Sequence, residues 1–209
     1  LRMVHNPEKE IITLINLGRT IQVVDSLNTL AWEIRREDLN NAYKASSISE
    51  EIAIELRYEK GIANALKAQG YCLWRFSDYP ASMDKSTEAL KIAEKNNDLK
   101  AQADILNNIG AVYMFLNDNE NRLVCNLKCL KIRKKIKDFD GVSGSLNNIG
   151  ETYLEMNEFD KAEQYFNDCL HYKYSVLDAK GWANHNLGLL FIKKNDFSNA
   201  TLSFKKSID

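Results

Sequence analysis

The chain has little that would interrupt helices or draw a strongly charged partner. Its 209 residues include two prolines and nine glycines, too few for long irregular linkers. No apolar run approaches the roughly 20 residues that a membrane span requires, so we expect no direct membrane insertion. The formal net charge is −1, which gives no electrostatic case for nucleic acid as a partner. These absences favour a helical protein without a nucleic-acid or membrane partner.

Signatures of catalysis are missing as well. The three histidines, His5, His171 and His185, are scattered and do not form the spacing of a zinc protease. No glycine-rich phosphate loop follows a strand pattern, and no Ser or Cys nucleophile has a recognisable sequence signature. We therefore expect a chain that is not an enzyme and has no cofactor, with any catalytic activity in a domain outside it.

What the sequence does contain is an internal repeat. Residues 106–110 read Leu-Asn-Asn-Ile-Gly, and the same five residues return 40 positions later at 146–150. A fixed period between 20 and 50 residues indicates an array whose units bury their apolar faces only by stacking. The small residue that closes the motif recurs at spacings of 39, 40, 40 and 38, at Ala31, Gly70, Gly110, Gly150 and Gly188.

A large apolar residue follows each of these small residues by three positions, so the two share one helical face. Short polar breaks separate the apolar segments and offer Asp or Asn as the N-cap of the next helix. No segment alternates with period two for long enough to indicate a strand. The pattern predicts an all-α fold of five helix pairs, each with an A helix and a B helix of about 15 residues.

The fourth pair resembles a known family. Its apolar, small and aromatic positions are Leu146, Ile149, Gly150, Tyr153, Ala162, Phe166 and Cys169. This pattern resembles the tetratricopeptide repeat, although Arg122 stands where the third pair should have Ala and Gln69 stands where the second should have a large apolar residue. The 40-residue period is similar to the longer-helix subgroup, which includes kinesin light chains and bacterial peptide-sensing proteins. The resemblance implies a right-handed α-solenoid that binds a protein or peptide.

We expect one solenoid domain over residues 1–209, as a fragment of a larger protein. A short helix at 7–17 has Asn6 as N-cap and Pro7 at its first position. The repeats are expected at about 21–58, 60–97, 99–137, 139–176 and 177–209. In the last helix, Leu202 and Phe204 would face a further helix that this chain does not supply. A homodimer through that C-terminal helix is therefore a further expectation.

The cysteines fit a repeat core. Cys129 and Cys169 occupy one small-residue position of consecutive repeats, where a free thiol packs as a compact apolar group. Cys125 lies one turn before Cys129, but no matching His or Cys pair completes a metal site. Equivalent positions of adjacent repeats lie too far apart for a disulfide. This usage favours the cytoplasm, while a periplasmic segment of a membrane sensor is left as an alternative.

The A helices of such a solenoid line its concave face. Counting the small residue as position 8, positions 2, 6, 9 and 13 lie away from the buried stripe and predict a peptide-binding groove. Its aromatic candidates are Trp32, Tyr71, Phe115 and Trp182. Its charged candidates are Arg36 and Arg75 at one end and Glu151 and Glu155 at the centre. This polarity would orient a ligand of mixed charge.

Asn108, Asn148 and Asn186 occupy position 6 of three consecutive repeats. An Asn amide both donates to and accepts from a peptide bond, so this ladder would hold an extended backbone without reading its sequence. The resemblance implies the same role, because the matching Asn of the long-repeat proteins holds peptides. Two alternatives are open: the Asn side chains bridge adjacent helices, and the aromatic rings pack sideways on the next A helix.

The resemblance and the groove together predict a protein- or peptide-binding module. It would act as the sensor or scaffold segment of a larger bacterial signalling protein of the histidine kinase, nucleotidyl cyclase or transcription regulator type. The alternative is a structural spacer or self-association element whose groove has no ligand.

Overall fold

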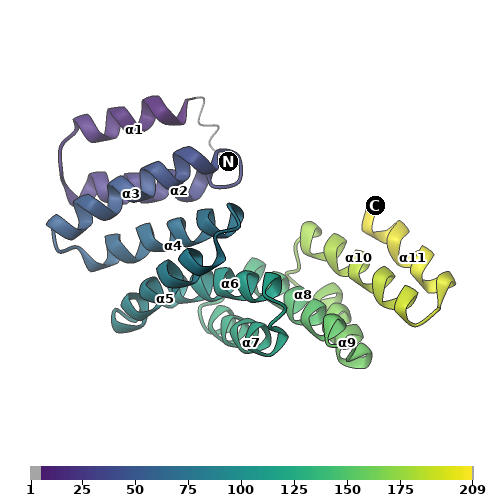
Figure 1. Cartoon of the computed structure of the whole chain (residues 1–209). Helices are drawn as coiled ribbons and strands as arrows, with labels where there is room; N and C mark the ends of the chain where they lie inside the picture. Colours follow the sequence, from purple (N-terminus) through teal and green to yellow (C-terminus); the bar gives the residue numbers. More distant parts are fainter. Residues whose placement is uncertain (1–5, 209) are drawn as a thin grey trace. The chain divides into compact units, whose positions relative to one another are not determined.

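The computed structural model describes residues 6–208, which form eleven α-helices and no strand (Figure 1). The predicted all-α fold of helix pairs is confirmed. The helices are α1 (Pro7–Asn16), α2 (Ile21–Ile34), α3 (Leu39–Glu55), α4 (Glu59–Arg75), α5 (Tyr79–Lys95), α6 (Leu99–Phe115), α7 (Asn119–Lys135), α8 (Phe139–Glu155), α9 (Phe159–His171), α10 (Leu177–Lys193) and α11 (Phe197–Ile208).

Each of the five expected repeats contains one pair, with α2, α4, α6, α8 and α10 as the A helices. The short helix α1 begins as its sequence predicts, since the Asn6 side chain accepts a hydrogen bond from the Lys9 amide at 3.0 Å and Pro7 follows. Gly18 ends the segment with a φ of 97°, a conformation that glycine adopts without strain. None of the helices among residues 6–208 is both long and apolar enough to cross a bilayer.

Most turns between helices share one backbone conformation. A residue with φ between 52° and 65° is followed by the N-cap of the next helix; these residues are Arg57, Ser77, Asn97, Asn117, Lys137, Asn157 and Asn195. The first six lie 20 residues apart. Asp78, Asp118 and Asp138 follow directly as N-caps and accept the backbone N–H three residues on at 3.1–3.2 Å. Asn tolerates a positive φ and Asp is a strong N-cap, so the Asn-Asp pairs of the sequence encode this turn.

The junction between α9 and α10 departs from this pattern in length. Helix α9 has 13 residues, whereas α8 and α10 have 17, and it ends at Tyr172 in an extended conformation. A loop then leads to α10, and its Tyr174 ring stacks on Phe139 with centroids 4.2 Å apart. The loop replaces the usual turn and accounts for the 38-residue spacing between Gly150 and Gly188.

The described residues form two compact units, 6–112 and 113–208. In the first, α1 packs on α2 and α3, and its Ile11 is fully buried in a core with Val24, Leu27 and Ile52. In the second, a separate core gathers apolar residues of α7 to α10; among its members are Leu146, Ile149, Leu154, Phe166, Cys169 and Leu190. Separate small hydrophobic cores are typical of a repeat protein, because each repeat contacts mainly its neighbours.

The polar residues that interrupt the repeat pattern find charged partners. Gln69 is buried and donates from Nε2 to Oε2 of Glu50 at 2.6 Å, and Glu50 also accepts from Nζ of Lys85 at 3.0 Å. Arg122, 4% exposed, pairs with the carboxylate of Glu151. A buried polar group destabilises the fold unless it is hydrogen-bonded, so these partners explain why the departures are tolerated.

All four cysteines are buried free thiols. Burial raises the pKa of Cys72 to about 12 and that of Cys125 to about 11, because a thiolate loses its hydration there. Burial also raises the pKa of Cys169, while a hydrogen bond with Ser175 acts in the opposite direction. These thiols are packing residues and stay protonated near neutral pH.

Candidate binding surface

The predicted groove residues fall in both units. The first unit contains Trp32 on α2, Arg36 in the turn that follows α2, Tyr71 and Arg75 on α4, and Asn108 on α6. The second contains Phe115 at the end of α6, Asn148, Glu151 and Glu155 on α8, and Trp182 and Asn186 on α10.

In the first unit, the predicted aromatic residues contact one another across adjacent A helices. The half-buried Trp32 and Tyr71 rings meet edge to face with centroids 6.1 Å apart. Trp74, one turn further along α4, extends the row with its centroid 5.5 Å from that of Tyr71. Arg75 is exposed at the end of α4, and its Nη1 lies 3.4 Å from the Tyr71 hydroxyl. Sideways packing of these aromatics, left open by the sequence, therefore occurs while both rings keep a partly exposed surface.

Two cations cover the Trp32 ring. The guanidinium carbon of Arg35 lies 3.9 Å from the centroid of the indole, and Nζ of Lys67 lies 4.4 Å from it. The same Arg35 carbon is 5.4 Å from the centroid of Tyr71. Both distances to Trp32 are within the range of a cation–π interaction. The first unit thus has a cation–aromatic cluster, defined here as Trp32, Arg35, Lys67, Tyr71 and Asp104.

Asp104 is the carboxylate of this cluster. Its Oδ2 lies 3.7 Å from Nζ of Lys67 and its Oδ1 lies 3.6 Å from Nζ of Lys100. Lys67 is 9% exposed, and its burial lowers the pKa of its ammonium group although Asp104 acts in the opposite direction. Burial, and then the neighbouring charge of Arg36, also lower the pKa of Arg35. Arg35 and Lys67 thus bring two positive charges together, and Asp104 within the cluster and Asp98 near it compensate them only in part.

Two members of the asparagine ladder bridge adjacent A helices. Asn108, 4% exposed, donates from Nδ2 to the carbonyl oxygen of Lys67 at 3.3 Å. Asn186, 6% exposed, donates from Nδ2 to Oδ1 of Asn147 at 3.1 Å. These contacts correspond to the bridging alternative of the sequence analysis. Asn147 is itself buried, as expected for a residue between helices.

Asn148 differs from the other two because it is half-buried. Its backbone carbonyl accepts hydrogen bonds from the Thr152 hydroxyl at 2.7 Å and from Nδ2 of Asn126 at 3.4 Å. The neighbouring Glu151 is directed to Arg122 on α7, whereas Glu155 is exposed. A peptide-holding role of the ladder stays a prediction, and Asn148 is the member that this structure leaves most accessible.

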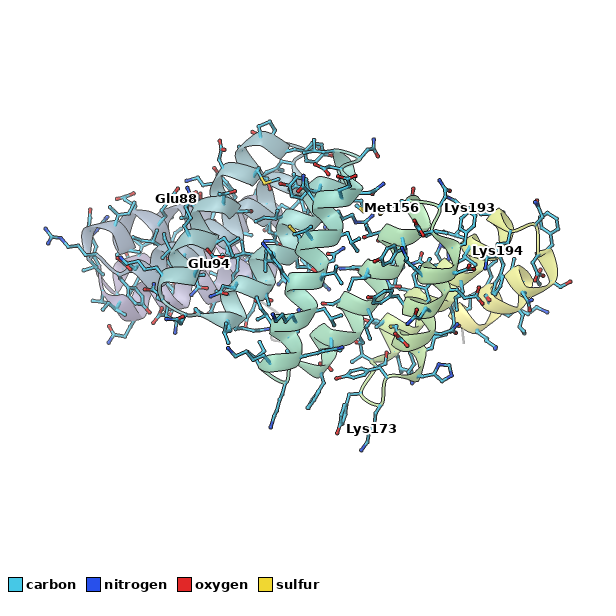
Figure 2. All side chains as sticks on the ribbon, turned by 90° about the horizontal axis from the view of Figure 1, so that it is seen from below. Glu88, Glu94, Met156, Lys173, Lys193 and Lys194 are labelled. Carbon is cyan, nitrogen blue, oxygen red and sulfur yellow. The ribbon has the colours of Figure 1, made fainter. Side chains whose placement is uncertain are left out.

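In the second unit, α10 exposes a large aromatic surface. Trp182 is 64% exposed and touches only the edge of the His185 ring among the ring contacts described, with centroids 6.4 Å apart. A hollow of about 550 Å³ beside it is lined by Leu177, Trp182, His185 and Lys206 among others. Lys193 and Lys194 lie at the opposite end of α10 (Figure 2), where Lys194 pairs with Glu163 of α9 at 2.8 Å. Phe115 is 50% exposed.

Reasoning from sequence missed Arg35 and did not place Lys67 in the groove. Arg35 directly precedes Arg36 in the sequence. The repeat pattern does not indicate which of the two arginines contacts the aromatic rings. Lys67 does leave a signal, because it interrupts a series that has Asn107 and Asn147 at the equivalent position of later repeats. Asp104 occupies groove position 2, where its carboxylate meets Lys67. No group of three or more potential metal ligands occurs within residues 6–208.

The helix pairs and their regular turns define an α-solenoid protein. The family profile described as tetratricopeptide repeat matches two segments of the chain, residues 103–136 and 143–173. The resemblance drawn from the fourth helix pair is thereby confirmed. Repeats of this family imply a protein-binding or scaffold role and are typically non-catalytic. No curated protein matches the sequence.

Solved structures share the fold. BtubC (BKLC) from P. vanneervenii has 18% sequence identity and a TM-score of 0.79, over 96% of this chain and 86% of that one. A Rap protein complexed with Competence and Sporulation Factor has 16% identity and a TM-score of 0.76, over 99% of this chain. The chain spans 59% of that Rap protein's length. Repeats of a putative kinesin light chain from Podosopora anserina have 11% identity and a TM-score of 0.71, over 88% and 92% of the two chains.

Proposed function

We propose that the chain captures a peptide, or an extended segment of a partner protein, on its A helices. The observation that carries this proposal is the Trp32–Tyr71 contact. The two residues lie 39 positions apart, occupy the same position of successive A helices, and are both only half-buried. Aromatic side chains supply large contact area at low entropic cost, and they are enriched among residues that dominate binding. Their repetition across α2 and α4 suits a ligand that crosses both helices.

The proposal extends to the setting of the module. A sensor or scaffold segment of a larger bacterial signalling protein agrees with the structural likeness to a Rap protein that was crystallised with Competence and Sporulation Factor. The output would be of the histidine kinase, nucleotidyl cyclase or transcription regulator type. Because units of a solenoid contact mainly their neighbours, a ligand that bridges two A helices changes their relative packing and passes that change along the array.

Binding of a fluorescent peptide library to the wild-type chain tests this function. We expect micromolar binders, and Tyr71→Leu should weaken them by about tenfold, the loss typical of an aromatic contact at the centre of an interface. Tyr174→Leu, which removes an aromatic ring from the α9–α10 loop, is the matched control and should bind normally. A library without any binder to the folded wild-type chain would contradict peptide capture.

The asparagine ladder has its own test within the same assay. Asn148→Ala should weaken peptide binding several-fold, because the amide would otherwise bond to the ligand backbone. Asn167→Ala, on the B helix α9, is a control of the same residue type and should leave the affinity unchanged. Equal affinities of the two variants would remove Asn148 from the mechanism without affecting the role of Tyr71.

Self-association is a second candidate function, and the exposed apolar residues of the last helix pair favour it. Leu177 is 85%, Trp182 is 64% and Ile208 is 86% exposed. Apolar surface of this kind often marks a protein–protein interface. Sedimentation equilibrium should show dimers that dissociate in Trp182→Ser, whereas a wild-type chain that stays monomeric at high concentration would exclude this role.

A further inference from the structure

We propose that the cation–aromatic cluster of the first unit recognises an acidic peptide segment, whose carboxylates pair with Arg35 and with the flanking Arg36 and Arg75. This inference rests on the proposed function, because it names the chemical class of the captured peptide. The candidate surface lies entirely within the first unit, on α2 and the turn after it, α4 and α6.

The charges on these helices favour a negative ligand. Arg35 and Lys67 face the Trp32 ring, while Arg36 and Arg75 are exposed at the ends of α2 and α4. The carboxylate within the cluster is Asp104, and it is shared between Lys67 and Lys100. Glu33 of α2 lines a different cleft, the one between α1 and α2. Clustered charge of one sign attracts and orients a partner of the opposite sign.

Arg35 is not fully used by the protein. Its Nη1 donates to the backbone carbonyl of Trp32, but its Nε is buried without an acceptor. A guanidinium has five N–H donors in a planar fork that matches a carboxylate in two-point contact. A small rotation of the side chain over the indole would present this fork to a ligand carboxylate and satisfy the orphaned donor.

Lys67 provides a second reason for an acidic ligand. The separation of 3.7 Å between its Nζ and Oδ2 of Asp104 is longer than a good hydrogen bond, and Lys67 is almost fully buried. Asp104 and the nearby Asp98 compensate this ammonium group only in part, because burial removes the water that would otherwise solvate it. An additional carboxylate near Trp32 supplies the missing negative charge. The aromatic row then contacts the apolar parts of the same peptide.

The three tryptophans of the chain permit a site-specific readout. Two of them, Trp32 and Trp74, lie in or next to the cluster, and Trp182→Phe removes the third. In this background, titration with an octaglutamate peptide should change the tryptophan emission and give an affinity about tenfold or more above that of octaglutamine, as expected for charge-assisted contacts. The affinity for octaglutamate should fall as salt is added, because screening weakens exposed ion pairs.

Variants localise the effect. Arg35→Gln should reduce octaglutamate affinity by about tenfold, the change typical of losing one charged hydrogen-bonding partner at an interface. Lys91→Gln changes the net charge equally on the outer helix α5 and should have no effect. Because Arg35 is partly buried, its substitution could also disturb the fold. The exposed double variant Arg36→Gln/Arg75→Gln is therefore a second test. It should also bind octaglutamate more weakly than the wild type, with an unchanged circular dichroism spectrum.

Three outcomes would overturn the inference. Octaglutamate and octaglutamine could bind equally, the two arginine variants could match Lys91→Gln, or binding could be lost instead in Lys131→Gln on α7. Neutral or basic library peptides that bind without any acidic preference would contradict the ligand class while peptide capture stands. Failure of every library peptide and of octaglutamate to bind the folded wild-type chain would contradict both proposals.

Discussion

Gly150 and Phe166 fit one another across the α8–α9 pair: a Cβ at residue 150 would lie 2.6 Å from both Cδ1 and Cε1 of the ring. The relationship returns in the next pair, where a Cβ at Gly188 would lie 2.5 Å from Cε1 of Phe204. In both cases the two residues are 16 positions apart. In these two pairs, the small residue that defines the repeat in the sequence is therefore required by the aromatic ring of the following B helix.

Gly150→Ala should destabilise the second unit by about 1–3 kcal/mol, since an added methyl group forces the buried Phe166 ring out of place. Gly144→Ala, on the same helix, is the matched control because nothing lies within 4 Å of its added Cβ. It should stabilise the helix by up to about 1 kcal/mol. Urea unfolding measures both, and two changes of the same sign would contradict the steric explanation.

Glu151→Ala should cost about 2 kcal/mol, because it leaves the buried guanidinium of Arg122 without its carboxylate. The value lies below that of a fully buried pair, since the Glu151 side chain is 35% exposed. Glu155→Ala, one turn further along, should change stability by less than about 0.5 kcal/mol. The double variant Arg122→Ala/Glu151→Ala should recover part of the loss in thermal unfolding. Equal losses of stability in Glu151→Ala and Glu155→Ala would contradict a structural role of Glu151 and leave peptide contact as its predicted role.

Lys137→Gly should stabilise the α7–α8 turn. Lys137 has a φ of 58°, which an L side chain with a Cβ adopts at a cost of about 1 kcal/mol and glycine adopts freely. Lys135→Gly, two residues earlier in the last turn of α7, should instead destabilise by up to about 1 kcal/mol through loss of helix propensity. Differential scanning calorimetry of the two variants should show melting temperatures that move in opposite directions from that of the wild type.

Alkaline pH should destabilise the chain through Cys72. Its pKa is about 12 in the folded chain against an ordinary 9.0, so above pH 9 the unfolded chain loses a proton that the folded chain keeps. Stability from this thiol is therefore intact below pH 9 and falls between pH 9 and 12, by about 1.4 kcal/mol per pH unit at most. Urea unfolding at pH 8 and pH 10.5 should show a steeper loss for the wild type than for Cys72→Ala. Parallel losses would exclude the thiol as the cause.

Local signals made the fold predictable. The Asn-Asp pairs place a residue that tolerates positive φ before a strong N-cap, so Asn97, Asn117 and Asn195 mark turns without any tertiary information. The 40-residue period then predicted that the helices form pairs, one pair in each repeat. The shortened α9 was visible in the sequence only as the 38-residue spacing. The Tyr174 ring of the loop after it stacks on Phe139, a contact between residues far apart in the chain that no local signal records.

The contacts of the candidate binding surface were predictable only in part. Trp32 and Tyr71 followed from their position relative to the small residue of each repeat. Such a pattern gives the rotation of an A helix about its axis only to within a few tens of degrees. A rotation of this size is enough to move Asn108 from the predicted groove-facing position to the buried position observed. The Arg35 and Lys67 contacts depend on which long side chains meet between helices, and no periodic pattern records that.

The recurring turn makes the length of this array adjustable in fixed steps. Removal of residues 98–137 would join Asn97 to Asp138 and recreate the same Asn-Asp step that residues 117 and 118 already form. The backbone on either side would keep its conformation, and each A helix would still be followed by a B helix. Shortening or extension by forty residues is therefore locally silent from Arg57 to Asn157, whereas the junction after α9 has a shape of its own and cannot be exchanged for any other.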